Sequence, residues 1–535
     1  MMKTGAEALA EGLMWMGVTE VTGYPGSPAT GIMEHYKKLA GELSDFQGRW
    51  MINEKVSFEY AVGSSLVGCR AATVLKNVGF NLVMDSLVIT ALTGVKAACL
   101  ILLGDDPGAR QSSHEEDARP LAVSAEVPLL EPAAPHRSPE VLRRAVEISE
   151  KYEVPVVIRF TPTFIDWQED VTFPEPPLLA QSVDESSGTV PRLTCVPHEA
   201  VSLHARLHKI MDNLSREAAL SHWEGSGSPG IIAVGDSWLK VRRVLGEMGA
   251  DSMRVMRLEE VNPLPVKSVL AFLAGVRDVF VVEETLPLVE EKVAAFCHQH
   301  RMDVRVWGKL TGHLPREDVL SVRDICIAIS ELARRGINGD ILSRLREDKV
   351  GWGEGTPVCE GCPYGTVLEA LRQYWRERGL PPPVLAGEPG CSARLSYPPH
   401  HKLDLFLCMG SSSPLISAVA ERRPDDGRPV AVIGDSAFLN SGIPALVEAC
   451  RLGARILVII VNNYSAALTG FQPTLELKQR QTVKTLAAII KGARPAFFAS
   501  VLEHELDRLL EVIRSAHSAK GPAVLLINAA CPSSS

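Results

Sequence analysis

Asp435 and Asn463, near the C-terminal end of the chain, have the spacing of a metal-binding pair. Asp435 lies in the tripeptide GDS (434–436) after an apolar run of strand length, and 25 residues separate it from the dipeptide NN (462–463). In a parallel sheet, two such strand ends lie side by side at the carboxyl edge, where ligands bind. Asp435, Asn463 and a backbone carbonyl near Ser465 would supply three oxygen donors, which together with phosphate oxygens suit octahedral Mg²⁺.

The residues around Asp435 favour a phosphate-containing ligand. Gly434 lets the backbone approach phosphates closely because it has no side chain. A structural Asp at a strand end beside an Asn-rich turn is the alternative, and the strand–helix–strand context favours the ligand site. The pattern is similar to the thiamine diphosphate (TPP) motif, GDG followed at this distance by NN, with Ser436 in place of the second Gly.

Four of the eleven cysteines form a second pattern. Cys359 and Cys362 make a C-x-x-C, Cys391 lies in EPGCS, and Cys531 lies in NAACP near the end of the sequence. An odd number of cysteines spread over a long chain argues against a disulfide framework, and close spacing then indicates metal ligands or redox groups. A zinc ribbon and unligated core cysteines are the alternatives.

Glu54 precedes a helical pattern with a small-residue face. An acidic residue at a helix start is most often a partner of the helix dipole. A buried Glu at this place could instead serve acid–base chemistry on a bound cofactor. Upstream, the segment GYPGSPATG (23–31) is a Gly/Pro turn before a helix.

Apolar runs of strand length alternate with helical patterns along the chain, which is typical of α/β domains with parallel sheets. We expect strands at 97–103, 154–160, 231–234, 279–282, 430–433 and 456–461, and helices at 54–74 and 444–451. A Pro/Ser-rich acidic stretch at 171–192 and a Gly-rich one at 340–358 predict boundaries. The sequence therefore predicts three parallel-sheet α/β domains, at residues 1–170, 192–335 and 350–535.

Composition excludes several classes of protein. The 535 residues are 46% hydrophobic and 22% charged, as in soluble globular proteins, and the net charge of −9 argues against a nucleic-acid partner. Glu7 and Glu11 interrupt any signal-peptide core, and no apolar stretch reaches the length of a membrane span. We therefore expect a cytoplasmic protein.

Several motifs in the same order resemble the large (alpha) subunit of indolepyruvate:ferredoxin oxidoreductase, in the family of TPP-dependent 2-oxoacid:ferredoxin oxidoreductases. They are GYPGSPAT, NEKVSFEYAVGSSLVGCRAATVLKNVGFN, GDDPGARQSSHEED and GDS…NNYSAALTGFQPT. The resemblance runs through the whole chain, and RDVFVVEETLPLVEE (277–291) resembles the family's transketolase C-terminal-like domain. It implies a pyrimidine-binding domain at 1–170, a transketolase C-terminal-like domain at 192–335, and a diphosphate- and Mg²⁺-binding domain with cluster cysteines at 350–535.

The resemblance also implies roles for individual residues. Glu54 becomes the carboxylate that activates the aminopyrimidine of TPP, and Ser27, where the family usually has Thr, contacts the substrate. The other implied cofactor-binding positions are Lys76, Asn77 (His in the family), Val78, Gly79, Cys408, Met409, Gly410, Gly434, Asp435, Ser436, Asn463, Ser465, Ala467 and Leu468. The implied ligands are Asp435, Asn463 and Ser465 for Mg²⁺, and Cys359, Cys362, Cys391 and Cys531 for a [4Fe–4S] cluster.

The implied activity is oxidative decarboxylation of a 2-oxoacid, indolepyruvate or another aryl-pyruvate, with CoA as cosubstrate and an acyl-CoA as product. Electrons would pass through the cluster to ferredoxin or another acceptor. Residues 161–166 (TPTFID) depart from the family, which has Arg and His there, so the oxoacid itself stays open. Two alternatives remain: a non-oxidative TPP-dependent decarboxylase or carboligase, which needs no cluster, and a subunit without catalysis.

Partners are implied in the same way. TPP sites commonly lie between domains of two chains, so we expect a homodimer of this subunit, joined by the family's small subunit into a heterotetramer. The family's large subunit continues beyond the position of Cys531 into a ferredoxin-like domain, and this sequence does not. We therefore expect electrons to leave through a partner subunit or an external acceptor.

Overall fold

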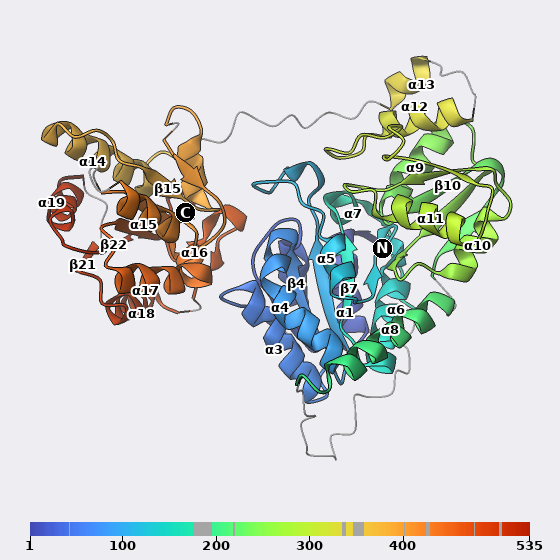
Figure 1. The fold of residues 1–535 in the computed structure, drawn as a ribbon, viewed down its shortest axis with the longest axis horizontal. Helices are drawn as coiled ribbons and strands as arrows, with labels where there is room; N and C mark the ends of the chain where they lie inside the picture. Colours follow the sequence, from blue (N-terminus) through green and yellow to red (C-terminus); the bar gives the residue numbers. More distant parts are fainter. Residues whose placement is uncertain are drawn as a thin grey trace. The chain divides into compact units, whose positions relative to one another are not determined.

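The computed structural model describes residues 1–41, 43–174, 195–217, 220–333, 339–345, 358–400, 402–423, 428–475, 477–501 and 506–534. By their internal contacts these residues form two compact units, 1–349 and 350–535 (Figure 1). Most of the two predicted boundary segments, 171–192 and 340–358, lies outside the described residues. The first unit holds two large sheets, and the division of the chain into three domains stays a prediction.

The first sheet of the first unit has seven strands in the order β12-β6-β7-β5-β4-β2-β3. All neighbours are parallel except β12, which is antiparallel to β6. The strands are β2 (Glu20–Gly23), β3 (Gln47–Trp50), β4 (Ala71–Lys76), β5 (Cys99–Gly104), β6 (Leu129–Leu130), β7 (Val156–Phe160) and β12 (Glu260–Asn262). Every residue of β5 and β7 is buried, as expected for a parallel sheet covered on both faces.

The second sheet has five strands in the order β14-β13-β10-β11-β9, parallel except for β9. They are β9 (His222–Glu224), β10 (Ser226–Val234), β11 (Met253–Leu258), β13 (Asp278–Val282) and β14 (Arg305–Trp307). A small ribbon pairs β1 (Met2–Thr4) with β8 (Gln168–Asp170).

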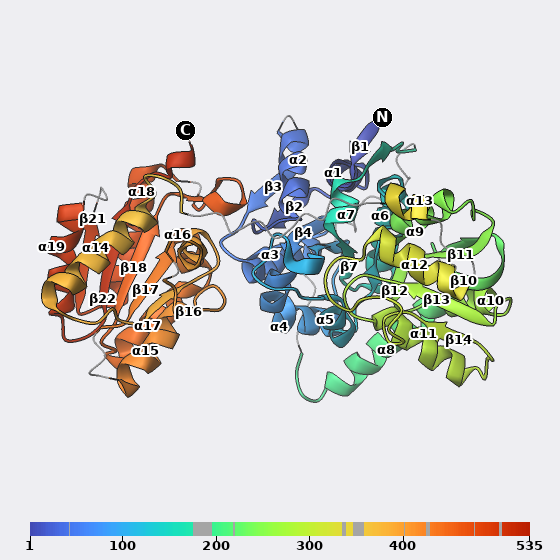
Figure 2. The ribbon, with the colours of Figure 1, turned by 90° about the horizontal axis from the view of Figure 1, so that it is seen from above.

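The helices of the first unit lie in the segments that connect these strands (Figures 1 and 2). They are α1 (Gly5–Trp15), α2 (Thr30–Ala40), α3 (Glu54–Leu66), α4 (Asn77–Thr93), α5 (Arg119–Ser124), α6 (Ser138–Tyr152), α7 (Pro162–Asp166), α8 (Ala200–Arg216), α9 (Ser237–Glu247), α10 (Val266–Leu273), α11 (Leu288–Gln299), α12 (Val322–Leu332) and α13 (Gly339–Arg344). Helices α3 and α4, which carry several predicted site residues, pack against each other.

The second unit is built on a six-stranded parallel sheet in the order β16-β15-β17-β18-β22-β21. Its strands are β15 (Leu385–Gly387), β16 (Leu405–Phe406), β17 (Val430–Gly434), β18 (Leu457–Asn462), β21 (Phe497–Val501) and β22 (Ala523–Asn528), with a separate ribbon of β19 (Ser465–Ala466) and β20 (Gln472–Pro473). Its helices are α14 (Pro363–Arg378), α15 (Ser412–Arg422), α16 (Asp435–Ala437), α17 (Ile443–Leu452), α18 (Gln479–Gly492) and α19 (Leu506–His517).

Successive residues along the central strands of this sheet pack alternately into two different hydrophobic cores. Val430 and Val432 of β17 pack with α14 and α19, whereas Ala431 and Ile433 pack with α15, α17 and α18. Figure 2 shows these two helix layers on opposite sides of the sheet. Because both faces of the sheet are buried, the strands carry continuous apolar runs.

The predicted strands are confirmed within β5, β7, β10, β13, β17 and β18, and the helix expected at 444–451 is confirmed as α17. The helix expected at 54–74 is wrong in its second half. Helix α3 ends at Leu66, Gly68 adopts a φ of +93°, and the chain continues as β4 from Ala71. A left-handed glycine ends a helix, and a short apolar run buried on both faces carries no strand periodicity that would have identified β4.

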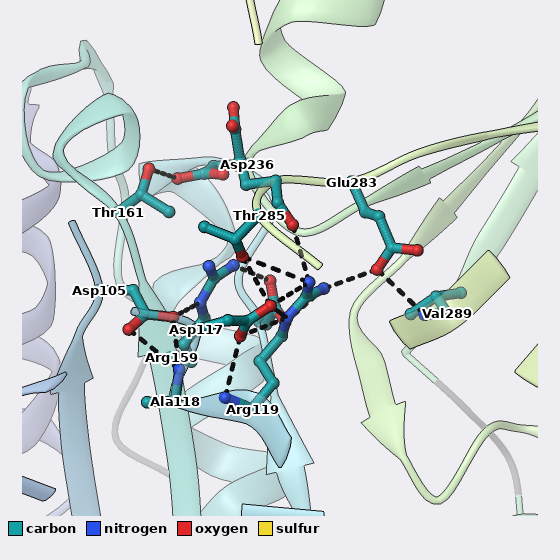
Figure 3. A network of polar contacts seen from close by, with 12 residues as sticks. Asp105, Asp117, Ala118, Arg119, Arg159, Thr161, Asp236, Glu283, Thr285 and Val289 are labelled. Carbon is teal, nitrogen blue, oxygen red and sulfur yellow. Dashed lines mark hydrogen bonds and ion pairs between the residues drawn. The ribbon is translucent and has the colours of Figure 1, made fainter. Parts of the chain in front are cut away.

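A buried ionic network joins the two sheets of the first unit (Figure 3). The guanidinium of Arg119, which has no solvent exposure, donates to the Asp117 carboxylate at 2.7 Å and, across to the second sheet, to Glu283 at 2.8 Å. Arg159 in β7 donates to Asp105 and to Glu131, each at 2.8 Å. The network fixes one relative placement of the two sheets because its hydrogen bonds are directional.

Removal of one cation from this network should destabilise the first unit strongly. We expect Arg119→Met to cost about 3–5 kcal/mol of unfolding free energy, because it leaves buried carboxylates without their countercharge. The matched control is Arg305→Met, which breaks an ion pair with Asp278 at a site where the arginine is 67% exposed; it should leave the unfolding midpoint almost unchanged. Urea unfolding checks both, and equal midpoints for the two variants would refute the structural role of the network.

Candidate active site

The first group of predicted site residues lies at the start of α3 and α4. Asn53 caps α3, since its side-chain oxygen accepts from the Val56 N–H at 2.8 Å, and Glu54 follows with 6% of its surface exposed. The Glu54 carboxylate lies against the first turn of α4: a Cβ on Gly79 would be 2.4 Å from Glu54 Oε1. Only glycine at position 79 leaves room for this carboxylate.

Ser27 and Lys76 lie at one edge of the first sheet. Ser27 follows β2, Lys76 ends β4, and β2 and β4 are parallel neighbours. The Lys76 stem packs on Gly26, where a Cβ would lie 2.9 Å from Lys76 Cβ. Ser27 and Lys76 are both half-buried, as is Val78 in the first turn of α4.

Two polar groups at this edge have unusual environments. Burial lowers the pKa of Lys76 to about 8, and the Asp106 carboxylate offsets only part of that shift. Asn77 is fully buried; its Nδ2 donates to the Glu116 carbonyl at 3.2 Å, while its Oδ1 has no hydrogen-bond partner among the described residues. A buried acceptor without a donor is costly, so it suits a site where a ligand supplies the donor.

In the second unit, Asp435 lies at the carboxyl edge of the sheet. Strands β17 and β18 pair directly, with Gly434 opposite Val461, so Asp435 and Asn463 follow neighbouring strand ends. The Asp435 carboxylate accepts from the Ser436 N–H at 2.9 Å and from the Thr474 hydroxyl at 3.0 Å. Burial raises its pKa to about 7 in spite of these bonds, and a nearby cation would favour the ionised form.

The two adjacent asparagines have different environments. Asn462 is fully buried and bonds through its Nδ2 to Asn528 Oδ1 at 2.7 Å. Asn463 is half-buried, and its Oδ1 accepts from the Ser465 N–H at 3.2 Å, which keeps a second lone pair for a ligand. Ala467 and Leu468 follow in a short 3₁₀ turn, where Leu468 is 50% exposed.

The loop Cys408-Met409-Gly410 is held by Glu388, a residue that sequence reasoning missed. The buried Glu388 carboxylate follows β15 and accepts from the Gly410 N–H at 2.8 Å and the Ser412 N–H at 3.0 Å. Gly410 has a φ of +82°, and a Cβ there would lie 2.6 Å from Ser441 Cβ. Cys408 is exposed at the tip of this loop.

The four cysteines of the second pattern come from three segments of the chain, and their thiols lie close enough together to affect one another's pKa. Cys359 and Cys362 precede α14, Cys391 follows β15, and Cys531 follows β22. Burial raises the pKa of Cys391 to about 11, and the other three thiols add to this effect while Arg394 opposes it. The Arg394 guanidinium also donates to Cys359 Sγ at 3.3 Å.

Tyr364 connects the two patterns of the second unit. This buried tyrosine follows Cys362 in α14, and a Cβ on Gly434 would lie 3.1 Å from its hydroxyl. Burial raises its pKa far above the ordinary value, and Cys391 and Asp435 add to the shift. Tyr364, Glu388 and Thr474 were missed from the sequence; the one signal for the first two is that they lie within three residues of Cys362 and Cys391, in CEGCPY and EPGC.

Two domain families match this chain in the order of its units. Residues 11–212 match "Pyruvate flavodoxin/ferredoxin oxidoreductase, thiamine diP-bdg", and residues 388–527 match "Thiamine pyrophosphate enzyme, C-terminal TPP binding domain". The second range contains Asp435 and Asn463, and the first contains Glu54. The fold and these matches define a thiamine diphosphate enzyme of the 2-oxoacid oxidoreductase class.

Curated relatives match along nearly the whole chain. The indolepyruvate oxidoreductase subunit IorA of Methanothermobacter thermautotrophicus is 30% identical over 99% of this chain and 87% of its own length. The IorA subunit of Methanothermobacter marburgensis is 29% identical over 98% of this chain and 86% of its own length. The IorA subunit of Pyrococcus horikoshii is 27% identical over 98% of this chain and 85% of its own length. The chain belongs to the family of indolepyruvate oxidoreductase subunit IorA, and it is a TPP-dependent 2-oxoacid:ferredoxin oxidoreductase.

A solved 2-oxoglutarate:ferredoxin oxidoreductase from Magnetococcus marinus, with 2-oxoglutarate, coenzyme A and succinyl-CoA bound, is 15% identical with a TM-score of 0.46, over 58% of this chain and 62% of that one.

No helix in the described part of the chain is both long and apolar enough to span a bilayer.

Gly79→Ala should displace the Glu54 carboxylate and, given the role that the sequence predicts for Glu54, should reduce turnover about 100-fold, the loss expected when a reacting group is misplaced by about 1 Å. Steady-state assays should place it near Glu54→Gln. The control is Gly246→Ala in α9, where an added Cβ meets no heavy atom within 4 Å, and which should keep full turnover. Wild-type turnover in a folded Gly79→Ala protein would mean that the position of Glu54 is immaterial.

Proposed function

We propose that this subunit oxidises a 2-oxoacid, indolepyruvate or another aryl-pyruvate, and passes the electrons through a [4Fe–4S] cluster to ferredoxin or a partner. The balanced reaction is 2-oxoacid plus CoA–SH giving acyl-CoA, CO₂, one proton and two electrons. The observation that carries the proposal is that β15, β17 and β22 run parallel in one sheet, so Cys391, Asp435 and Cys531 all follow strand ends at its carboxyl edge.

The described residues fit TPP with Mg²⁺. Asp435 is a buried carboxylate whose partners are a hydroxyl and backbone N–H groups, and a hard divalent cation satisfies such a group. Asn463 and the Ser465 carbonyl would complete the protein ligands. In the first unit, Asn77 Oδ1 offers a buried acceptor, and Glu54 would hold or donate a proton at the aminopyrimidine. Bound TPP supplies the stabilisation of the carbanion that decarboxylation produces.

The four cysteines fit a cluster with four thiolate ligands. Such a cluster supplies one-electron acceptance at low potential. Arg394, through its N–H bond to Cys359, would stabilise a thiolate. Cys359 and Cys362 also line an open hollow with Thr366 and His400, which supports electron transfer to an acceptor that approaches from solvent.

Ser27 and Lys76 would bind the oxoacid. They lie at adjacent strand ends, and the Lys76 ammonium is the charge complement of a 2-oxoacid carboxylate. The Ser27 hydroxyl can donate to the ketone oxygen or the carboxylate. Glu54 follows β3, the other parallel neighbour of β2, at the same edge.

Exposed apolar side chains support the proposed homodimer. Helices α3 and α4 pack side by side and carry Val56, Tyr60, Leu82, Val88 and Ile89, each at least 36% exposed. Several exposed apolar side chains on two neighbouring helices favour a protein interface, here with a second copy, beside the small subunit of a heterotetramer. A monomer mass for this chain alone in sedimentation equilibrium would contradict the dimer.

An anaerobic visible spectrum with Mg²⁺ and TPP, recorded before and after indolepyruvate and CoA, tests the proposal. Broad iron–sulfur absorption should be present and should bleach when substrate is added. Cys531→Ser should lose most of this absorption, whereas Cys69→Ser, which changes an exposed cysteine, should retain it. Turnover of the oxoacid by protein prepared without air but lacking iron–sulfur absorption would establish the non-oxidative alternative.

The catalytic efficiency for the oxoacid should depend on the protonation of Lys76. Its pKa is lowered to about 8, so the ammonium is present below pH 8 and kcat/KM for the oxoacid should fall as the pH rises through that value. Ionisation of the CoA thiol would change the rate in the opposite direction. Lys76→Gln should remove this decline and lower kcat/KM, whereas Lys267→Gln, at an exposed position on α10, should leave both unchanged. A decline that persists in Lys76→Gln would refute this role.

A further inference from the structure

Two histidines and a glutamate outside the active-site region converge on the surface of the first unit. His204 and His208 lie one turn apart on α8, and their rings have centroids 4.4 Å apart. Glu126 lies in the turn between α5 and β6. His204 Nε2 is 3.0 Å from Glu126 Oε1, and His208 Nε2 is 3.2 Å from the same oxygen.

The arrangement has the donor spacing of a metal centre. One donor atom from each residue lies within 4.8 Å of the other two. Zinc binds imidazole nitrogen and carboxylate oxygen at about 2.0–2.2 Å, which puts two donors of a tetrahedral site about 3.3 Å apart. Residues i and i+4 of a helix are neighbours on one face, so the backbone of α8 sets the two imidazoles side by side before an ion binds.

The electrostatics also suit a cation. Glu126 supplies a carboxylate oxygen within 3.2 Å of both imidazoles. The side chains of His204 and His208 are 52% and 61% exposed, so water can complete the coordination sphere.

We propose that Glu126, His204 and His208 bind a divalent transition-metal ion such as Zn²⁺. Imidazole and carboxylate ligands together favour zinc and its neighbours in the first transition row over Mg²⁺ or Ca²⁺. The ion would be structural: it would tie α8, which packs against α4 and α10, to the turn that precedes β6. This inference is independent of the proposed electron transfer.

The test compares zinc binding by the complete, cluster-containing protein with binding by the double variant His204→Gln/His208→Gln. Glutamine can still hydrogen-bond to Glu126 but is a poor zinc ligand. Wild type should bind one more equivalent of Zn²⁺ in calorimetric titration, and its thermal midpoint should rise with zinc more than that of the variant. The control is His298→Gln, which removes an exposed histidine of α11 and should behave as wild type.

X-ray absorption at the zinc edge separates this site from adventitious binding to cysteine. The extra equivalent should show nitrogen and oxygen ligands at about 2.0–2.1 Å and no sulfur shell at about 2.3 Å. Equal zinc stoichiometry in wild type and the double variant, or an equivalent with sulfur ligands only, would overturn the proposal. Because the readouts are stoichiometry, stability and ligand type, the result does not depend on turnover of the oxoacid.

Discussion

The packing of the first unit depends on two buried arginines. Arg119 and Arg159 are each at most 1% exposed, and both lie within ion-pair distance of Glu131. Buried charges are costly unless they are paired and hydrogen-bonded, so the sheets that supply the carboxylates have to stay together. The same loop that begins with Asp105 and ends with Asp117 also borders Lys76, through the Gln111 carbonyl.

The carboxyl groups of this network differ in the direction of their pKa shifts. Burial raises the pKa of Asp105 to about 7 and raises that of Glu283, whereas Arg119 lowers the pKa of Asp117. Asp117 also accepts from the Thr285 hydroxyl at 2.6 Å and the Leu286 N–H at 3.1 Å. These hydrogen bonds favour its ionised form.

The two units use the same structural solution for their site residues. In each, parallel strands buried on both faces end at one edge, and the polar side chains follow those ends: Ser27 and Lys76 in the first unit, Asp435 and Cys391 in the second. A parallel sheet directs its strand ends, and the helix starts that follow them, toward a ligand. The apolar core therefore fixes where these polar side chains lie, and the side chains themselves supply the chemical groups.

The sequence predicted this architecture well where pattern and chemistry agree. GDS and NN predicted neighbouring strand ends, and β17 and β18 are neighbours. Periodicity failed at β4, because a strand buried on both faces has no alternation. Thr474 could not be found, because its contact is with a distant residue: it reaches Asp435 across 39 positions. Glu388 and Tyr364 had one signal only, their closeness in sequence to Cys391 and Cys362. The roles of the individual site residues came from family resemblance rather than from spacing.

Strand β12 has a consequence for how the chain is made. It completes the first sheet by pairing with β6, yet it begins at Glu260, after three strands and a helix of the second sheet. Glu283, a partner of Arg119, lies 164 residues after that arginine in the chain. At a synthesis rate of about 5–20 residues per second, Arg119 waits roughly 8–30 s for that carboxylate. During translation, the nascent first sheet thus has an open edge, and Arg119 has its local partner Asp117 but lacks the carboxylate that ties it to the second sheet.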